Sequence, residues 1–258
     1  MRSLRNPEKL LGVLPFAVLG LVWWLVTATG VVHRNVLAGP PEVWRATTDL
    51  ASRGLLQDDI VTSLLRLVLA MAVSLVLGVG LGLLAGLNRP VSDFLLPLVS
   101  FFNSISGIAW IPLAIVWFGL GTVTVTFVLV NSIFFLIFFN TVLGVRSVPA
   151  VLENAVKTLG GGRRELVLQV YLPGALPFIM SGIRGGFGFG WRALIAAELT
   201  AATSGLGYLI YNASNYARGD QILAGIIVIG ALWIVIDMAV LAPIERRTVQ
   251  RWGTVRQV

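Results

Sequence analysis

Three charged side chains interrupt one apolar stretch of the sequence, residues 174–200: Arg184, Arg192 and Glu198. A charge exposed to hydrocarbon is unfavourable by several kcal/mol, so intramembrane charges usually face a cavity or a partner group. At about 100° per residue, a helix places all three on one broad face. We therefore predict a helix that lines a passage, in which Arg192 attracts an anion. The alternative is structural, with Arg184 snorkelling to the nearer membrane surface while Arg192 and Glu198 neutralise partners.

Two charges in other apolar stretches are expected to be structural. Asp237 is predicted to pair with an arginine of another helix, with a proton relay as the alternative, and Arg66 is predicted to snorkel to the outer membrane surface. The sequence has no cysteine and His33 is its one histidine, which excludes disulfides, thiol catalysis and a cysteine or histidine metal cluster. It also lacks the Walker-type G-x-x-x-x-G-K-[ST] motif, so the chain is not expected to be an enzyme that hydrolyses ATP.

The elements that position these charges are apolar helices. Of the 258 residues 57% are hydrophobic and 12% are charged, which gives more apolar surface than a soluble domain of this size can bury. A span takes roughly 20 apolar residues and must bond its backbone internally, so the sequence predicts an all-α membrane protein. About six transmembrane helices are expected, at residues 11–32, 60–87, 95–118, 122–145, 174–200 and 222–244, with a short interfacial helix at 42–53.

The basic residues predict how the spans are oriented. Most of the 19 Lys and Arg residues lie in the segments 1–10, 88–94, 146–173 and 245–258. The positive-inside rule places these segments, and therefore both termini, in the cytoplasm. The net charge of +7 is then a topology signal and no indication of nucleic-acid binding.

The long loop at residues 146–173 has a helical pattern that glycine interrupts. It reads Glu-Asn-Ala-Val-Lys-Thr-Leu-Gly at 153–160, Gly-Gly-Arg-Arg-Glu at 161–165 and Val-Tyr-Leu-Pro at 170–173. The glycines at 160–162 allow two helices to meet at an angle, and Pro173 suits the start of the next span. Such a segment is expected either to insert into a partner's groove or to pack on the end of the bundle.

This loop resembles the E-A-A-x-x-x-G-(nine residues)-I-x-L-P loop of permease subunits of ATP-binding-cassette importers, the loop that docks onto the ATPase. Gly160 and Pro173 are thirteen residues apart, as in that motif, with Val170 and Leu172 at its apolar positions. The position of the motif's glutamate holds Asn154, and Glu153 lies one residue earlier, so the glutamate's role is assigned to neither. The resemblance implies an ATPase-coupling site at Asn154, Ala155, Gly160, Arg163, Arg164, Leu172 and Pro173. The two arginines are expected either to contact the partner or to serve as cytoplasmic anchors.

Other segments resemble one branch of that family, the nitrate, sulfonate and taurine importers. These segments are 109–121, 173–179 with 182–184, Trp191 with 196–198, and 204–210, and the likeness covers the chain from Val36 onward. One departure is the stretch 103–107, which reads Asn-Ser-Ile-Ser-Gly where the branch usually has an Arg and a Pro pair. This stretch is more polar and less rigid than an Arg and Pro pair, and it is expected to change the pore or the substrate.

The resemblance implies a multi-pass subunit of a prokaryotic cell membrane that imports a small anion, such as a sulfonate, taurine, nitrate or bicarbonate, by alternating access. The implied partners are two ATPase subunits, which bind ATP and Mg, a second copy of the chain and an extracytoplasmic solute-binding protein. No cofactor or metal is expected on this chain. Residues 1–59 form a head, first span and outer loop, 60–245 the transporter core and 246–258 a basic tail.

Two alternatives remain open at this stage. The same architecture also suits uptake of a thiamine-pyrimidine or riboflavin precursor, since specificity in such systems rests mostly with the binding protein. A different class is an ATP-independent channel or secondary transporter, which would predict inverted repeats that the sequence does not display.

Overall fold

The computed structural model describes residues 7–30 and 37–243, and all regular structure in that part of the chain is helical. The long elements are α1 (Pro7–Ala28), α3 (Leu55–Leu87), α6 (Thr122–Arg146), α9 (Leu172–Ala201) and α11 (Gly219–Ile236), which continues as the π-helix η3 (Asp237–Leu241). The all-α prediction is confirmed. His33 and the basic tail at 246–258 lie outside the described residues.

The predicted third span is not one continuous helix. The chain forms α4 (Arg89–Asn103), then breaks and resumes as a short 3₁₀ turn, η1 (Gly107–Trp110), and α5 (Ile111–Phe118), with a bend of 82° between the two parts. The break falls in the polar stretch 103–107, where Gly107 packs so closely on Ser132 of α6 that a Cβ would collide with its hydroxyl. Within the described residues, four helices are long and apolar enough to cross a membrane, or five if the bent pair is one span.

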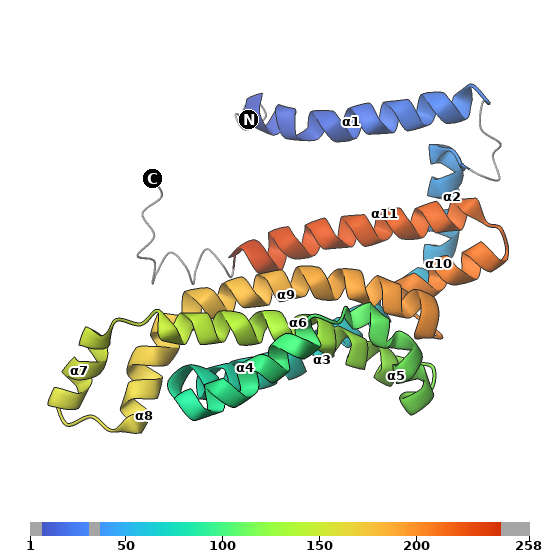
Figure 1. Cartoon of the computed structure of the whole chain (residues 1–258). Coiled ribbons are helices and arrows are strands. Elements are labelled where there is room, and N and C mark those ends of the chain that lie inside the picture. Colours follow the sequence, from blue (N-terminus) through green and yellow to red (C-terminus); the bar gives the residue numbers. More distant parts are fainter. Residues whose placement is uncertain (1–6, 31–36, 244–258) are drawn as a thin grey trace.

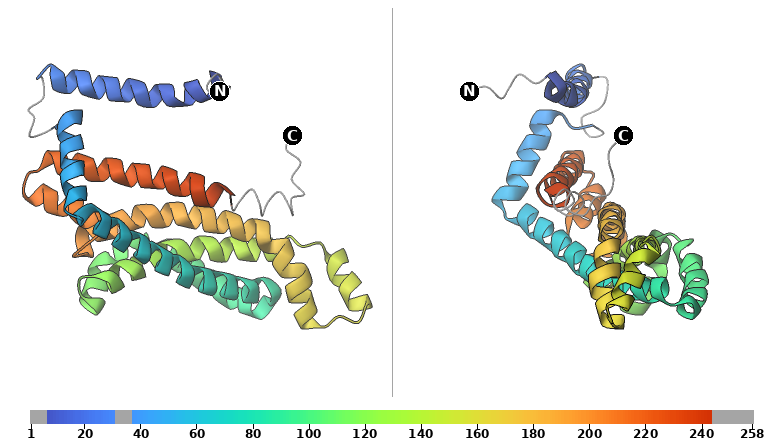
Figure 2. Two further views of the ribbon diagram at one scale, coloured as in Figure 1. Left: turned by 180° about the vertical axis from the view of Figure 1, so that it is seen from behind. Right: turned by 90° about the vertical axis from the view of Figure 1, so that its left-hand side faces the viewer.

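Helix α6 lies between α3 and α9, and glycines on both neighbours allow the close contact (Figure 2). On α3, a Cβ added to Gly82 would lie 2.6 Å from Cβ of Thr141; on α9, one added to Gly190 would lie 2.6 Å from Cδ1 of Ile133. Small residues four apart let helix backbones approach, the arrangement by which apolar helices associate in lipid. The other glycines of these two stripes are Gly78 and Gly86 on α3, and Gly182 and Gly186 on α9.

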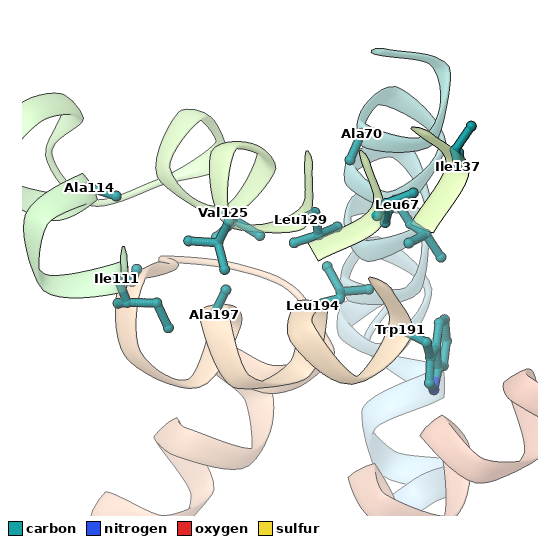
Figure 3. Close-up of a cluster of buried hydrophobic side chains, with 13 residues drawn as sticks. Leu67, Ala70, Ile111, Ala114, Val125, Leu129, Ile137, Trp191, Leu194 and Ala197 are labelled. Atoms are coloured by element: carbon teal, nitrogen blue, oxygen red, sulfur yellow. The ribbon is translucent and has the colours of Figure 1, made fainter. Parts of the chain in front are cut away.

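The main core fills the space where α3, α5, α6 and α9 meet (Figure 3). Leu129 of α6 and Leu194 of α9 are fully buried there, beside Leu67 of α3 and Ile111 of α5. This packing fixes the rotation of α9, and therefore decides which of its charged side chains face inward.

Short helices gather at the two ends of the bundle (Figure 1). At one end lie α2 (Pro40–Ser52), where a helix at 42–53 was predicted, and α10 (Leu206–Asn215), which lies between the predicted spans 174–200 and 222–244, where no helix was predicted. At the other end α7 (Ala150–Thr158), α8 (Arg163–Glu165) and the π-helix η2 (Leu166–Tyr171) extend beyond α6 and α9.

Candidate functional site

The segment at residues 150–171, called the elbow below, consists of α7, a glycine turn, α8 and η2. Gly160 has φ +80, a left-handed conformation that favours glycine and ends α7. Gly161 packs against Val156, and the backbone N–H of Gly162 donates to Glu165 Oε2 at 3.0 Å, which caps α8. The predicted pattern of helix, glycine break and second helix is present, and Leu172 and Pro173 open α9 as expected.

The two arms of the elbow are joined by Glu153. Its carboxylate accepts hydrogen bonds from Lys157 Nζ and from the hydroxyl of Tyr171, both at 2.6 Å, so it links α7 to the end of η2. These hydrogen bonds from Lys157 and Tyr171 hold the pKa of the Glu153 carboxyl below its ordinary value. Glu153 therefore has a role inside the elbow, whereas Asn154 on the same helix is exposed.

One arginine of the elbow contacts the bundle and the other points to solvent. Arg163 Nη2 donates to Asn88 Oδ1 at the end of α3, at 2.7 Å, while Arg164 and Ala155 are exposed. The elbow also exposes large apolar side chains: 87% of Leu159 is accessible, and Val151, Leu152 and Leu168 are each more than half exposed. A protruding element with uncovered apolar side chains is suited to a partner surface.

A groove of about 510 Å³ lies on the side of the bundle between α9 and α11. Its lining residues are Ser181, Arg184, Gly185, Gly188, Phe189, Arg192, Trp233 and Asp237. The groove combines aromatic and glycine surface with two arginines and one carboxylate, so its formal charge is positive. Such a groove attracts anions and offers apolar surface to the rest of an organic anion.

The two arginines of the groove differ in their partners. Arg184 Nη2 donates to Asp237 Oδ1 at 3.2 Å, which confirms the predicted pairing of Asp237 with an arginine of another helix. Arg192 is exposed and makes no hydrogen bond or ion pair with the described residues. Arg192 is therefore the group in the groove that is available to an anion.

Glu198 does not share this face. It is fully buried, and its Oε1 lies 2.8 Å from Nη1 of Arg66 on α3, whose side chain is 3% exposed. Packing against α6 turns this face of α9 inward, so the expected grouping of Arg184, Arg192 and Glu198 separates into a groove pair and a buried acid. The prediction that Arg66 snorkels is wrong, because a buried carboxylate lies within its reach.

Sequence reasoning missed the rest of this buried site, called the Arg66 network below. The hydroxyl of Ser63 lies 2.9 and 2.8 Å from the two oxygens of Glu198, and Arg66 also bonds Ser204 and Thr122. Ser63 and Arg66 are one turn apart on α3, a spacing that places both polar groups on one helix face. This spacing was the feature of the sequence that could have indicated a buried polar site. Their partner, however, is more than a hundred residues away in the sequence.

Residues 78–247 match the family of binding-protein-dependent transport system inner membrane components. Over 245 residues the chain is 33% identical to the taurine transport system permease protein TauC of Escherichia coli (strain K12), covering 93% of this chain and 89% of that one. Over 261 residues it is 31% identical to the bicarbonate transport system permease protein CmpB of Synechococcus elongatus, covering 95% and 91%.

The fold is also similar to a solved transporter. A structure of the MetNI methionine ABC transporter in an inward-facing conformation aligns with a TM-score of 0.62, at 19% identity, over 75% of this chain and 96% of that chain. At this identity the likeness concerns the fold.

Proposed function

The chain belongs to the family of binding-protein-dependent transport system inner membrane components, and from this we propose that it is the membrane-spanning permease subunit of an ATP-binding-cassette importer. Its cargo is a small anion of the taurine, sulfonate or bicarbonate type, the kinds of solute named for its relatives, which include a putative aliphatic sulfonates transport permease protein of Bacillus subtilis (strain 168). The observation that carries the proposal is the protruding elbow with its uncovered apolar side chains at one end of a bundle of long apolar helices.

The proposed topology has six spans in a prokaryotic cell membrane, with α1 as the first and both termini in the cytoplasm. The elbow then lies on the cytoplasmic side, and α2 and α10 on the outer side. Residues 60–245 form the transporter core, preceded by a head, first span and outer loop at 1–59 and followed by the tail 246–258. The basic segments 146–173 and 245–258 support this orientation.

The proposed assembly pairs two copies of the chain with two ATPase subunits and an extracytoplasmic binding protein. Each elbow docks in one ATPase through Asn154, Ala155, Gly160, Arg163 and Arg164, and Leu172 and Pro173 carry its motion into α9. The ATPase binds ATP and Mg and performs the hydrolysis, so this chain is non-catalytic. Closure of the ATPases on ATP rocks the spans and exposes the passage alternately to either side.

The groove is proposed as this chain's part of the translocation path. Arg192 attracts the anion, Arg184 extends the positive charge along α9, and Asp237 balances Arg184 when no cargo is present. The sequence also suggested Glu198 for the translocation path. In the proposed arrangement Glu198 does not line the path but holds α9, which does, against α3.

The elbow assignment is tested by substituting Gly160 with valine, which the left-handed backbone at φ +80 disfavours. The complex of the chain with the ATPase and binding protein encoded with it is purified, and uptake of labelled taurine and bicarbonate into vesicles is measured beside ATP hydrolysis. We expect Gly160→Val to abolish co-purification with the ATPase or to uncouple hydrolysis from uptake.

A matched control is Gly230→Val in α11, where an added Cβ meets nothing within 4 Å. Normal assembly and coupling of Gly160→Val would contradict the elbow assignment. Uptake by the chain in the absence of the ATPase and of ATP would contradict the whole proposal and favour a channel or secondary transporter.

A further inference from the structure

The Arg66 network is a buried ion pair with well-satisfied hydrogen bonds. Arg66 and Glu198 are 3% and 0% exposed and 2.8 Å apart, and Ser63 bonds both oxygens of the carboxylate. Removing two charges from solvent is unfavourable, and apolar residues of similar volume often hold helices together equally well. The presence of the pair therefore calls for a role beyond holding α3 against α9.

Most of the remaining hydrogen bonds of the Arg66 network reach the turn between α9 and α10 or the first residues of α10. Arg66 Nη1 donates to the carbonyl of Ser204 at 2.7 Å, and Nη2 donates to the hydroxyl of Ser204 at 3.0 Å. The backbone N–H of Gly207 donates to Glu198 Oε2 at 3.0 Å, and that of Leu206 to Ser63 Oγ at 2.9 Å. The Arg66 guanidinium thus binds the turn at Ser204, and the first two residues of α10 donate to Ser63 and to Glu198.

A second residue of α3 and the start of α6 are also bonded at this point. Asp59, near the start of α3, accepts a hydrogen bond from the backbone N–H of Gly205 at 2.7 Å. Thr122, the first residue of α6, accepts from Nε and Nη2 of Arg66, both at 3.2 Å. The network therefore ties α3, α6, α9 and α10 together at one end of the bundle.

The turn that the Arg66 network holds is also the wall of a polar cleft. This cleft, of about 600 Å³, lies between α2 and α10, and the turn residues Thr203 and Ser204 line it together with Asp59. Its other lining residues include Asp49, Arg53, Tyr208, Asn212, Tyr216 and Arg218. Charges of both signs beside an exposed tyrosine, with 73% of Tyr216 accessible, suit contact with a polar protein surface.

Helices α2 and α10, which border the cleft, lie at the opposite end of α9 from the elbow (Figure 1). Helix α9 has 30 residues, which corresponds to a length of about 45 Å. Its last turn carries Glu198, and its first residues Leu172 and Pro173 follow the elbow directly. The turn at 202–205 continues α9 directly, and the hydrogen bonds of the Arg66 network make it rigid, so that a force applied to the cleft wall reaches α9 instead of deforming the turn.

We propose that Arg66 and Glu198 are positioning residues that fix the wall of the α2–α10 cleft to α9, so that docking of the extracytoplasmic binding protein at the cleft is transmitted along α9 to the elbow. This inference rests on the proposed function, because it requires an outer partner and a cytoplasmic ATPase. It adds to that function the residues through which the signal enters the bundle.

The experiment uses the full complex in lipid nanodiscs and compares basal ATP hydrolysis with hydrolysis stimulated by the binding protein. Arg66→Lys keeps the positive charge and loses the planar fork that bonds Glu198, Ser204 and Thr122 at once. We expect this variant to assemble with unchanged basal hydrolysis, while stimulation falls about tenfold, as for loss of one or two charge-assisted hydrogen bonds. Arg45→Lys, on the exposed side of α2, is the matched control and should keep full stimulation.

A second variant tests whether the hydrogen bonds to the turn, and not merely the balance of the two buried charges, are required. The double substitution Arg66→Met with Glu198→Met removes both buried charges and lets the complex assemble, but it also removes the hydrogen bonds to the turn. Stimulation is expected to stay low in this variant. Full stimulation in either assembled variant overturns the inference, as does failure of both to assemble, which would make the pair a folding requirement. If the unchanged chain does not co-purify with the ATPase, the proposed function itself fails.

Discussion

Arg192 is the charged residue of α9 that stands without a partner in the described part of the chain, and its neighbours in the groove leave it accessible. Arg192→Ala should impair uptake without loss of the assembled complex. A charge-assisted hydrogen bond contributes roughly 1.5–3 kcal/mol, so the half-saturating cargo concentration should rise about tenfold or more. Initial uptake rates over a range of taurine and bicarbonate concentrations measure this.

Arg45→Ala on α2 serves as the control for this substitution, because it removes an exposed arginine that does not line the groove. Arg192→Lys should retain part of the uptake, since the charge is kept. Unchanged uptake by Arg192→Ala would remove this residue from the translocation path.

Gly205 illustrates how tightly the buried acid is surrounded. It has φ +107, and an added Cβ would collide with the carboxylate of Glu198. Gly205→Ala should therefore lower the free energy of unfolding of the purified complex by roughly 1–3 kcal/mol. The midpoint temperature of thermal unfolding should fall accordingly. Fluorescence-monitored unfolding measures the shift, and equal midpoints for Gly205→Ala and the unchanged chain would contradict the described turn.

At the level of elements, the contact between α3 and α6 depends on small residues at one spacing. Gly82 and Gly80 lie on the same helix, but a Cβ at Gly82 would be 2.6 Å from Thr141, whereas one at Gly80 meets nothing within 4 Å. Gly82→Ala should destabilise the chain by roughly 1–3 kcal/mol through overpacking. Gly80→Ala is the matched control and should be neutral or slightly stabilising. The same unfolding measurement decides, and equal effects of the two changes would contradict the helix packing.

The elbow is a second element whose shape can be tested, through the hydrogen bonds of Glu153. Spin labels on cysteines placed at Val151 and Leu168, both exposed, report the distance between its arms in this cysteine-free chain. Glu153→Gln should broaden the distance distribution at neutral pH, because the charged link between α7 and η2 is lost.

The pH dependence of the elbow follows from the direction of the shift. The folded-state pKa of Glu153 is lower than the ordinary value of 4.5. The contribution of the Glu153 carboxylate to the stability of the elbow is therefore fully present above pH 4.5 and is lost as the pH falls through the folded-state pKa. The unchanged chain should therefore resemble Glu153→Gln in strongly acidic buffer. Identical distributions for the two chains at neutral pH would show that Glu153 does not join the arms.

For the whole molecule, the decisive question is which side of the membrane each end of the bundle occupies. Arg164 is exposed on the elbow and Ser214 is exposed on α10 at the opposite end. Since the sequence has no cysteine, single cysteines at these positions can be labelled by a membrane-impermeant thiol reagent on intact cells. Arg164→Cys should react only after the membrane is opened and Ser214→Cys without opening; the reverse result would invert the topology.

Much of the fold could be predicted from the sequence because it depends on local physics. A long apolar segment in lipid must satisfy its own backbone, so 60–87, 122–145 and 174–200 had to be helices, and the structure places α3, α6 and α9 there. The glycines at 160–162 and Pro173 likewise act within a few residues of themselves. The bend at 104–106 and α10 were missed, because polar, glycine-containing stretches fit a loop as well as a short helix.

The sequence by itself thus determined an all-helical, strongly apolar chain, the shape of the elbow and, through the resemblance of its motifs, the family. Only the tertiary structure decided which charged side chains meet. Arg66 and Glu198 lie 132 residues apart, and their pairing depends on the rotation of α9 against α6 and α3, which the packing of Leu129, Leu194 and the glycine stripes sets. A charge in an apolar segment demands a partner or a cavity, but helical periodicity gives only its angle on its own helix; the neighbour that fills that angle comes from packing.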